Sequence, residues 1–465
     1  MKKVIPFVLV IVLLVSVGLV LAQGGLPGSG WKSGQQIQNV GNASAKVVFT
    51  AYDDTGKSYD CGEKTIAPGA SATYLTDTDC PVDAGFIGAA VVSADQAIAA
   101  IVNVNNRGTG AAAGQYQGTD GVDVDNTISF PLVKNNHSGR TTTFYVQNAS
   151  TSPNTMTATF AVNGSTYNKT FSNVPANAMR IFSPSDAGVP AGQGQVGSLE
   201  VVGTQPLAGS SLEHQTSAAV GQNLQASKAF VAADGATEVF CPLYRNAHTK
   251  KSQTTGAQVQ NVTGSSVTVN FTVQAGSSTY GPYTRTIAAG ASETFYAPDL
   301  TSPSIPAGTV GSATISSTGK VVAVVNDAGT DNGVQRKTTY ACFGSGGTTV
   351  NVPLAKEFAG GNTTGIQVQN VGTGNTKVTL EYKASGAALK IESTAAIAPG
   401  QSITAYGVSS ASPEWQVLSS TGSMAGAVSG VVVTANQPVV AIANESSAAP
   451  SPSGQDTKNY EGFSQ

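Results

Sequence analysis

The chain of 465 residues contains one passage four times, and this repetition limits its fold more than any other feature. The dipeptide Gln-Asn marks each copy, and its Asn residues are spaced by 109, 113 and 109 positions. The four copies are Gln38-Asn39, Gln147-Asn148, Gln260-Asn261 and Gln369-Asn370. A second marker, the dipeptide Pro-Leu, occurs at Pro131, Pro242 and Pro353, at intervals of 111 residues. Because domains commonly have about 100 to 150 residues, each copy is long enough to fold as one domain.

Each copy is predicted to be a β-sandwich, so that the whole chain is all-β. In the fourth copy Val378, Leu380 and Tyr382 alternate with polar residues, and this period of two is typical of a strand with one buried face. Such a sheet needs a cover, and without helical periodicity after the N-terminal segment the cover is predicted to be a second sheet. About seven such runs in about 110 residues favour an immunoglobulin-like sandwich, and proline in the Pro-Leu run predicts an edge strand there. The predicted domains are residues 23–126, 127–237, 238–348 and 349–465.

The composition argues against nucleic acid as a partner. Only 11% of the residues are charged, and 24 basic against 27 acidic residues give a formal net charge of −3. The sequence has no cluster of Lys or Arg that could neutralise a run of phosphates. Ser, Thr, Asn, Gln and Gly dominate the polar residues instead, which is a composition typical of extracellular β proteins.

The N-terminal segment has the pattern of a secretory signal. Two lysines precede an apolar run that starts at Val4, and Val20 and Ala22 fit the residues before a cleavage site. Residues 1–22 are therefore predicted to be a signal peptide, and the mature protein is predicted to be secreted or held at the cell surface. An uncleaved membrane anchor is the alternative, because the 19-residue run from Val4 could nearly cross a bilayer. A membrane is a predicted partner only in that case.

The chain has four cysteines, which suits two disulfides in an exported protein. Cys61 and Cys80 lie 19 residues apart in the first copy, whereas Cys241 and Cys342 lie 101 residues apart, close to one repeat length. Metal binding is the alternative, but the sequence has no C-x-x-C pair and its three His are scattered. The predicted pairs are Cys61 with Cys80 and Cys241 with Cys342.

The order of the recurring phrases resembles a known kind of surface protein. "PLAK" from Pro353, "TGIQVQNVG" from Thr364, "IAPGASATY" from Ile66 and "PVVAIAN" from Pro438 are similar to the tandem modules of secreted, surface-associated proteins of filamentous green non-sulfur bacteria. This resemblance covers nearly the whole chain after the signal segment. It implies an extracellular repeat protein, and it implies no catalytic residues.

The first copy departs from the pattern, because it lacks the Pro-Leu strand. Pro27 lies only 12 residues before Asn39, so the first sandwich either has fewer strands or is completed by another segment. An open sheet edge is a template for strand addition from another chain. Head-to-tail self-association is therefore a prediction, in which Tyr460 and Phe463 of the C-terminal tail dock near Pro27 and Trp31 of the next chain. A monomeric rod is the alternative.

Two small groups of residues in the sequence are candidates for binding a ligand. Asp120, Asp123 and Asp125 are a weak candidate for Ca²⁺, because closely spaced carboxylates can ligate it, but the spacing is not that of an EF-hand loop and a solvated loop between domains is favoured. Trp31 and Trp415 could stack on sugars at the cell surface, although sandwiches commonly use such residues in their cores. Contact with a polysaccharide therefore enters as the alternative function.

The Gln-Asn dipeptide is interpreted as a Gln that faces solvent followed by an Asn that forms a turn. A polar binding row is the alternative interpretation. Lys134 and Lys356 in the Pro-Leu strands could in principle form an isopeptide bond with Asn326 and Asn444, and the favoured interpretation is that these are solvated edge residues.

The sequence shows none of the common catalytic motifs, since it has no G-x-S-x-G, no H-E-x-x-H and no phosphate-binding loop. We therefore expect no enzyme activity and no cofactor. The predicted function is that of an extracellular structural protein that forms a surface rod, coat or filament, and the alternative is an adhesin or carbohydrate-binding protein.

Overall fold

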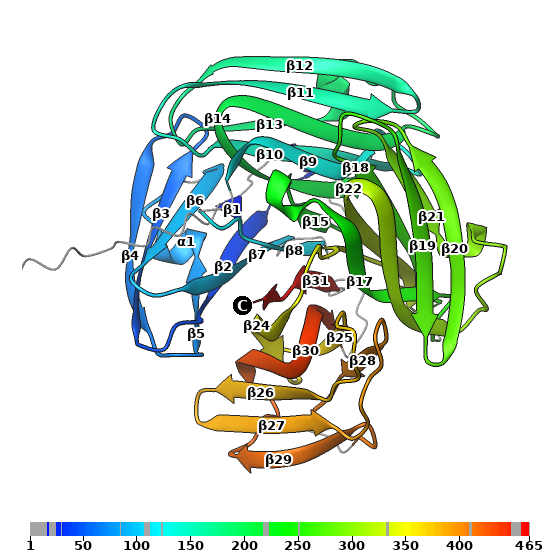
Figure 1. The fold of residues 1–465 in the computed structure, drawn as a ribbon. Coiled ribbons are helices and arrows are strands. Elements are labelled where there is room, and N and C mark those ends of the chain that lie inside the picture. The colour runs from blue at the N-terminus through cyan, green and yellow to red at the C-terminus, as the bar shows by residue number, and fades with distance from the viewer. Residues whose placement is uncertain are drawn as a thin grey trace, which may run out of the picture.

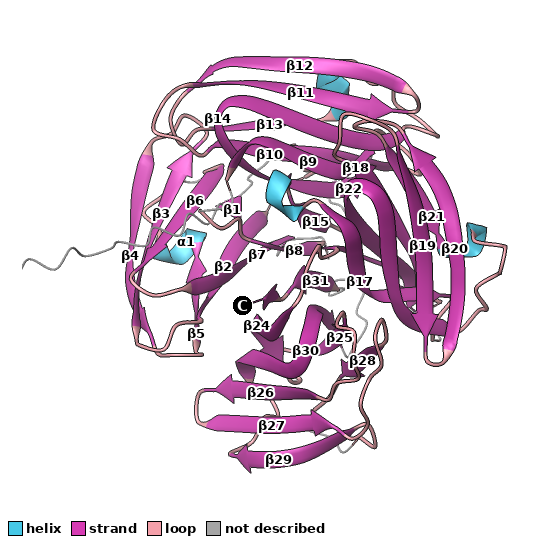
Figure 2. Cartoon of the chain, in the orientation of Figure 1, coloured by secondary structure: helices cyan, strands magenta, loops and turns pink. Residues whose placement is uncertain are grey.

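The computed structural model describes residues 16–17, 25–28, 30–83, 85–106, 112–121, 124–216, 223–249, 252–331, 334–408, 412–447 and 457–464. Almost all regular structure in these residues is β-strand, as Figure 2 shows. The helical elements among them are single short turns, namely α1 (Thr76–Asp79), η1 (Pro184–Ala187), η2 (Ala232–Asp234) and η3 (Ala297–Asp299). The prediction of an all-β fold is confirmed.

Each repeat consists of two antiparallel layers with the same strand order. In the first repeat the outer layer contains β4 (Ser58–Ile66), β3 (Ala45–Asp53), β6 (Gly88–Ala94) and β1 (Ser16–Val17), and the inner layer contains β5 (Ser71–Leu75), β2 (Trp31–Asn39), β7 (Ile98–Asn106) and β8 (Ala113–Gln117). Alternate residues of β3 are buried, because one face of its layer packs on the other layer.

The later repeats keep this order but join the layers through one long strand. In the second repeat β14 (Val196–Gln215) pairs with β9 (Asp125–Lys134), β10 (Arg140–Asn148), β11 (Asn154–Val162) and β15 (Gln225–Lys228), while β12 (Ser165–Val174), β13 (Met179–Phe182) and β16 (Phe230–Val231) complete the layers. The first half of β14 belongs to the outer layer, and its second half belongs to the inner layer.

The third and fourth repeats are built in the same way. The third contains β17 (Ala236–Asn246), β18 (Thr254–Asn261), β19 (Val267–Ala275), β20 (Ser278–Ile287), β21 (Ser292–Tyr296), β22 (Thr309–Asp331) and β23 (Val334–Ala341). The fourth contains β24 (Gly347–Lys356), β25 (Asn362–Asn370), β26 (Val378–Ala384), β27 (Ala387–Ser393), β28 (Ser402–Ala405), β29 (Trp415–Thr421), β30 (Val428–Ser447), β31 (Lys458–Glu461) and β32 (Phe463–Ser464). Strand β29 has no counterpart among the described residues of the other repeats, and it forms the outer edge of its sheet.

The Pro-Leu strands β9, β17 and β24 each contain a β-bulge at the proline. The register with the long strand shifts around Pro131, Pro242 and Pro353. A bulge removes ladder hydrogen bonds locally, so the missing N–H of proline costs little there. In the first repeat the two residues of β1 pair with β6, with Ser16 opposite Ala90. Strand β1 therefore takes the position beside β6 that β9 takes beside β14 in the second repeat.

The predicted signal peptide lies outside the described residues except for Ser16 and Val17. In the described part of the chain, the structure contains no helix that is long and apolar enough to span a membrane.

Both predicted disulfides are confirmed. Cys61 of β4 is bonded to Cys80, with an Sγ–Sγ distance of 2.03 Å, and Cys241 of β17 is bonded to Cys342, with a distance of 2.02 Å. No cysteine is free. Two structural disulfides indicate an oxidising environment of the extracellular kind.

The four repeats surround a common axis and close into a ring (Figure 1). The closure joins the first and last repeats, because Ile101 of β7 is part of the hydrophobic core of the fourth repeat, and the Ser71 hydroxyl donates a hydrogen bond to the Pro353 carbonyl at 2.9 Å. Similar apolar contacts cross the other seams, for example where Ile442 of β30 joins the core of the third repeat. The repeats are therefore arranged in a circle and not in a line.

The Gln of each Gln-Asn dipeptide is buried, and two of these residues donate hydrogen bonds across a seam. Gln260 Nε2 donates to the Leu199 carbonyl of the second repeat at 3.4 Å, and Gln369 Nε2 donates to the Ala313 carbonyl of the third repeat at 3.5 Å. The buried glutamines are Gln38, Gln147, Gln260 and Gln369. The prediction that these side chains face solvent is wrong, because the neighbouring repeat covers them.

The Asn of the dipeptide forms a turn, as predicted. Asn261 Nδ2 donates to the Ser265 carbonyl at 2.7 Å, and its Oδ1 accepts a hydrogen bond from the Thr263 N–H at 2.9 Å. Asn370 Nδ2 binds the Gly374 carbonyl in the same way at 2.8 Å. The Asn therefore supplies side-chain partners to a turn whose backbone groups would otherwise be unpaired.

Candidate functional site at the ring axis

One strand from each repeat lies next to the axis of the ring. These axis strands are β8, β15, β23 and β31, and each contacts the next one around the circle, with β31 returning to β8. Each axis strand also pairs with its own long strand or, in the first repeat, with β7. The axis is thus the place where all four repeats contribute side chains.

In two of the axis strands, β23 and β31, a tyrosine hydroxyl forms hydrogen bonds to the Pro-Leu strand of the same repeat. Tyr340 of β23 donates a hydrogen bond from its hydroxyl to the Leu243 carbonyl at 2.6 Å and accepts one from the Leu243 N–H at 3.1 Å. Tyr460 of β31 makes the same pair of bonds with Leu354. Each tyrosine therefore ties an axis strand to the Pro-Leu strand of its own repeat.

The C-terminal tail is used within its own chain. Tyr460 is 1% exposed in the core of the fourth repeat, and Phe463 of β32 pairs with Asn351 of β24. At the other end, Trp31 is 0% exposed, and its indole N–H donates to the Pro27 carbonyl at 2.9 Å. Head-to-tail self-association stays a prediction, but the anchors chosen for it already have partners inside one chain.

The sequence of the C-terminal tail matches that of the axis strand of the third repeat in the spacing of two aromatic residues. The run "TYACF" of the third repeat and the run "NYEGF" of the tail both place Phe three residues after Tyr, at Tyr340 and Phe343 and at Tyr460 and Phe463. The spacing of three fits a strand that leaves the long strand and crosses to the Pro-Leu strand, where Phe343 forms a bridge with Phe240. The tail is therefore the last copy of a repeated element.

Each Pro-Leu strand carries a cation that pairs with an acid on the long strand near the axis. The pairs are Lys134 with Glu213, Arg245 with Asp327, and Lys356 with Glu445. The side chains of Lys134 and Lys356 are only 17% and 21% exposed. The prediction that these lysines are solvated edge residues is therefore wrong. The first repeat, which has no Pro-Leu strand, has Val104 at the matching position of β7.

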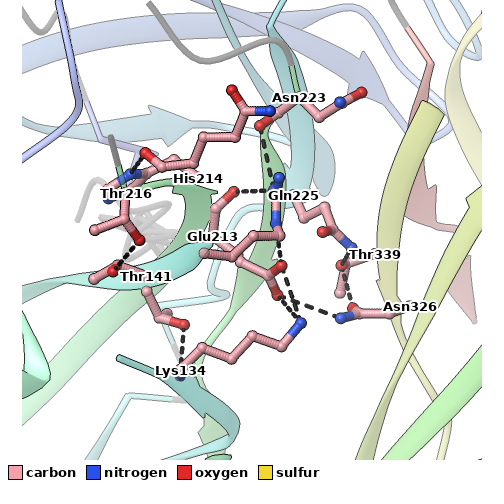
Figure 3. Close-up of polar contacts among 12 residues, drawn as sticks. Lys134, Thr141, Glu213, His214, Thr216, Asn223, Gln225, Asn326 and Thr339 are labelled. Carbon is pink, nitrogen blue, oxygen red and sulfur yellow. Dashed lines mark hydrogen bonds and ion pairs between the residues drawn. The ribbon is translucent and has the colours of Figure 1, made fainter. Parts of the chain in front are cut away.

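The Glu213 cluster, shown in Figure 3, contains more than one ion pair. Lys134 Nζ lies 3.0 Å from Glu213, and Arg140 Nε donates to the same carboxylate. From the third repeat, Asn326 Nδ2 donates to Glu213 Oε2 at 3.3 Å, and Thr339 donates to Asn326 Oδ1. The cluster therefore joins the second and third repeats through one carboxylate.

Burial alone would raise the pKa of Glu213, but the charges and hydrogen bonds of Lys134 and Arg140 outweigh it and lower the pKa to about 2. Glu213 is therefore ionised at neutral pH and accepts hydrogen bonds from both Lys134 and Asn326. The contacts of Glu213 with Lys134 and Asn326 are an ion pair and a hydrogen bond, so the structure shows a noncovalent cluster here.

The Glu213→Gln substitution is expected to lower the free energy of unfolding at pH 7 by about 3 kcal/mol, since a pKa shift from 4.5 to about 2 corresponds to that energy. Because the pKa of the folded state is the lower one, this stabilisation is present above pH 4.5 and is lost as the pH falls toward 2. Urea unfolding at pH 7, 4 and 2.5 would show a smaller loss of stability on acidification in the variant. The matched control is Glu414→Gln, at an exposed position; equal acid sensitivity of both variants would contradict the assignment.

A second polar site lies at one mouth of the axis, where a cavity of 420 Å³ is bounded by all four repeats. Its lining includes Gln117, Lys228, Ala341 and Glu461, one from each axis strand. Glu461 is 2% exposed, and burial raises its pKa, while its Oε1 accepts a hydrogen bond from the Ala341 N–H. Lys228 is paired with Asp234 at 3.2 Å.

The remaining predicted ligand residues are Asp120, Asp123 and Asp125, for calcium, and Trp415, for sugars. Asp125 accepts a hydrogen bond from the Thr127 N–H at 3.3 Å, and Asp123 lies outside the described residues. In the part of the chain that the structure describes, no group of three His, Cys, Asp or Glu is placed to hold a metal ion. The calcium site therefore stays a prediction. Trp415 is half-buried and donates to the Thr404 carbonyl at 2.8 Å.

Comparisons with known proteins do not assign this chain to a family. No protein-family model matches it, and no curated protein matches it. Among solved structures, it is similar to the Anabaena sensory rhodopsin transducer (22% identity, 19% of this chain and 92% of the other, TM-score 0.17) and to Thermotoga maritima 1070 (16% identity, 24% and 95%, TM-score 0.20). A chain from the structure of a bacterial ice-binding adhesin is similar at 13% identity over 70% of this chain and 90% of the other, with a TM-score of 0.11. These TM-scores are too low to support a function.

Proposed function

We propose that the protein is a non-catalytic, exported structural protein that coats the cell surface by associating with further copies of itself. The disulfides and the secretory pattern of the N-terminal segment support export. The resemblance of the repeats to modules of bacterial surface proteins agrees with this. The ring of sandwiches acts in this proposal as a rigid building unit.

The observation that carries the proposal is the exposed edge of the fourth repeat. Val417 and Leu418 of β29 are 62% and 49% exposed, and β29 pairs on one side with β27 while its other side has no partner strand in the described chain. The sequence of β29, "WQVLSST", contains no charge and no proline, two of the features that commonly protect an edge. Of the nine exposed large hydrophobic residues in the described chain, five lie in this repeat: Phe358, Tyr406, Val417, Leu418 and Val428. We infer that a second copy pairs with this edge.

Placing a charge on the edge is expected to prevent the association. The Val417→Lys substitution would leave the fold intact, because the side chain is exposed, and would convert assemblies of the purified mature protein into monomers by light scattering and electron microscopy. Val48→Lys is the matched control, since Val48 is exposed on β3, between two paired strands. Assemblies that persist in Val417→Lys, or a wild-type protein that is monomeric at all concentrations, would refute the proposal.

Carbohydrate binding is a second candidate, which rests on two aromatic residues at one corner of the fourth repeat. Tyr406 is 54% exposed, and the half-buried Trp415 is bonded to Thr404, two residues before Tyr406. Such rings can stack on sugars. Tyr283 of the third repeat does not add a ring to such a surface, because it is buried and its hydroxyl donates to the Pro303 carbonyl. Binding of surface polysaccharide that is lost in Tyr406→Ala would favour this candidate.

A further inference from the structure

A cavity of 310 Å³ lies beside the Glu213 cluster, between the second and third repeats. Its lining residues are Ser138, Gly139, Arg140, Gln215, Gln335 and Lys337. Two of them are cations that come from different repeats: Arg140 begins β10, and Lys337 lies on the axis strand β23. None of the lining residues is acidic.

Arg140 uses two of its three guanidinium nitrogens in hydrogen bonds to the protein. Its side chain is 2% exposed; Nε donates to Glu213, and Nη2 donates to the carbonyls of Glu213 at 3.0 Å and Asn223 at 3.3 Å. Its Nη1 is buried and has no hydrogen-bond acceptor among the residues that the structure describes. A buried guanidinium nitrogen without an acceptor is costly, so this position favours an acceptor from outside the chain.

The charges around the cavity do not balance. Lys134 and Arg140 share the single carboxylate of Glu213, and no ion pair of Lys337 is found in the described residues. Burial, followed by the charge of Arg140, lowers the pKa of Lys337 to about 8. The charge of Lys134 also lowers the pKa of Lys337, whereas the charge of Glu213 raises it. An added negative charge would relieve this repulsion.

We propose that this cavity binds one small oxyanion group, either a phosphate or sulfate ion or the carboxylate of an acidic sugar. Arg140 and Lys337 line the cavity and supply the positive charge that attracts the anion, and Ser138 and Gln335 line the rest of it. A volume of 310 Å³ is at the lower end of ligand sites, which suits a small group. The site is distinct from the β29 edge and does not depend on assembly.

Calorimetric titration at pH 8 tests the site with inorganic phosphate and glucuronate as probes, at an ionic strength fixed with sodium chloride. Wild-type protein is expected to bind one equivalent, and to take up protons in buffers of different ionisation enthalpy, because the bound anion raises the pKa of Lys337. The Lys337→Gln variant is expected to bind at least tenfold more weakly and to take up no protons. Lys46→Gln, which removes an exposed charge in the first repeat, is the matched control and should bind like wild type.

The probes also separate the two sources of the anion. Tighter binding of phosphate indicates a free ion, whereas tighter binding of glucuronate indicates an acidic polysaccharide, and either result supports the site. The proposal is overturned if neither probe binds at millimolar concentration, or if Lys337→Gln binds with unchanged affinity and proton uptake. Thermal unfolding of Lys337→Gln without ligand confirms that the variant is folded.

Discussion

Replacing Cys241 and Cys342 together with alanine is expected to lower the free energy of unfolding by about 4 to 5 kcal/mol. The disulfide closes a loop of 101 residues. Closing a loop of this length lowers the conformational entropy of the unfolded chain, which stabilises the folded state by about 4 to 5 kcal/mol. It also joins β17 to the segment after β23, so its loss removes one of the links that hold this axis strand. Chemical denaturation of the double variant in oxidising buffer measures the effect.

The Cys61 and Cys80 pair serves as the comparison. Its sequence separation is 19, so the same chain-entropy argument predicts a smaller loss of about 3 kcal/mol for Cys61→Ala with Cys80→Ala. If the two double variants lose equal stability, or the shorter loop is worth more, loop length does not govern these disulfides.

Replacing Tyr460 with alanine is expected to cost about 3 to 5 kcal/mol, as truncation of large buried aromatic residues commonly does. Tyr460 is buried in the core of the fourth repeat, and its hydroxyl hydrogen-bonds to the backbone of Leu354. Because β31 contacts both β23 and β8, the same change is expected to loosen the contact between the fourth and first repeats. Hydrogen exchange of the β8 amides would rise along with the loss of stability.

Two further variants separate packing from hydrogen bonding at this position. Tyr460→Phe keeps the ring and removes the hydroxyl, so it should cost only about 1 to 3 kcal/mol. Val417→Ala truncates an exposed residue of the same repeat and should have little effect. A Tyr460→Ala protein as stable as wild type would show that the tail is not part of the folded unit.

The sandwich of each repeat could be predicted because its causes are local. Alternation such as that of Val378, Leu380 and Tyr382 requires one buried face, and the fixed spacing of the Gln-Asn dipeptides shows that the same unit recurs. The pairing of Cys241 with Cys342 followed from a separation close to one repeat length. These inferences needed no knowledge of how the repeats are packed together.

The ring could not be predicted because its seams combine apolar residues, such as Ile101 and Ile442, with polar residues that are typical of protein surfaces. Gln260, Ser198 and Gly290 meet at one seam, where the Ser198 hydroxyl donates to the Gly290 carbonyl at 2.7 Å. No hydrophobic stripe marks such contacts in the sequence. The site at Arg140 has the same difficulty, since this arginine occurs in one repeat only and its role depends on Lys337 of the next repeat, 197 positions away.

A ring made by one chain differs from a ring of four identical subunits in what it can place at its centre. Identical subunits must present the same residue four times around the axis, so that a charge there would face three copies of itself. Here the four matching positions hold Gln117, Lys228, Ala341 and Glu461. Covalent continuity thus frees each quadrant to diverge independently, and the centre of the molecule can hold a single basic residue, Lys228, and a single acidic residue, Glu461, which a ring of four identical subunits could not do.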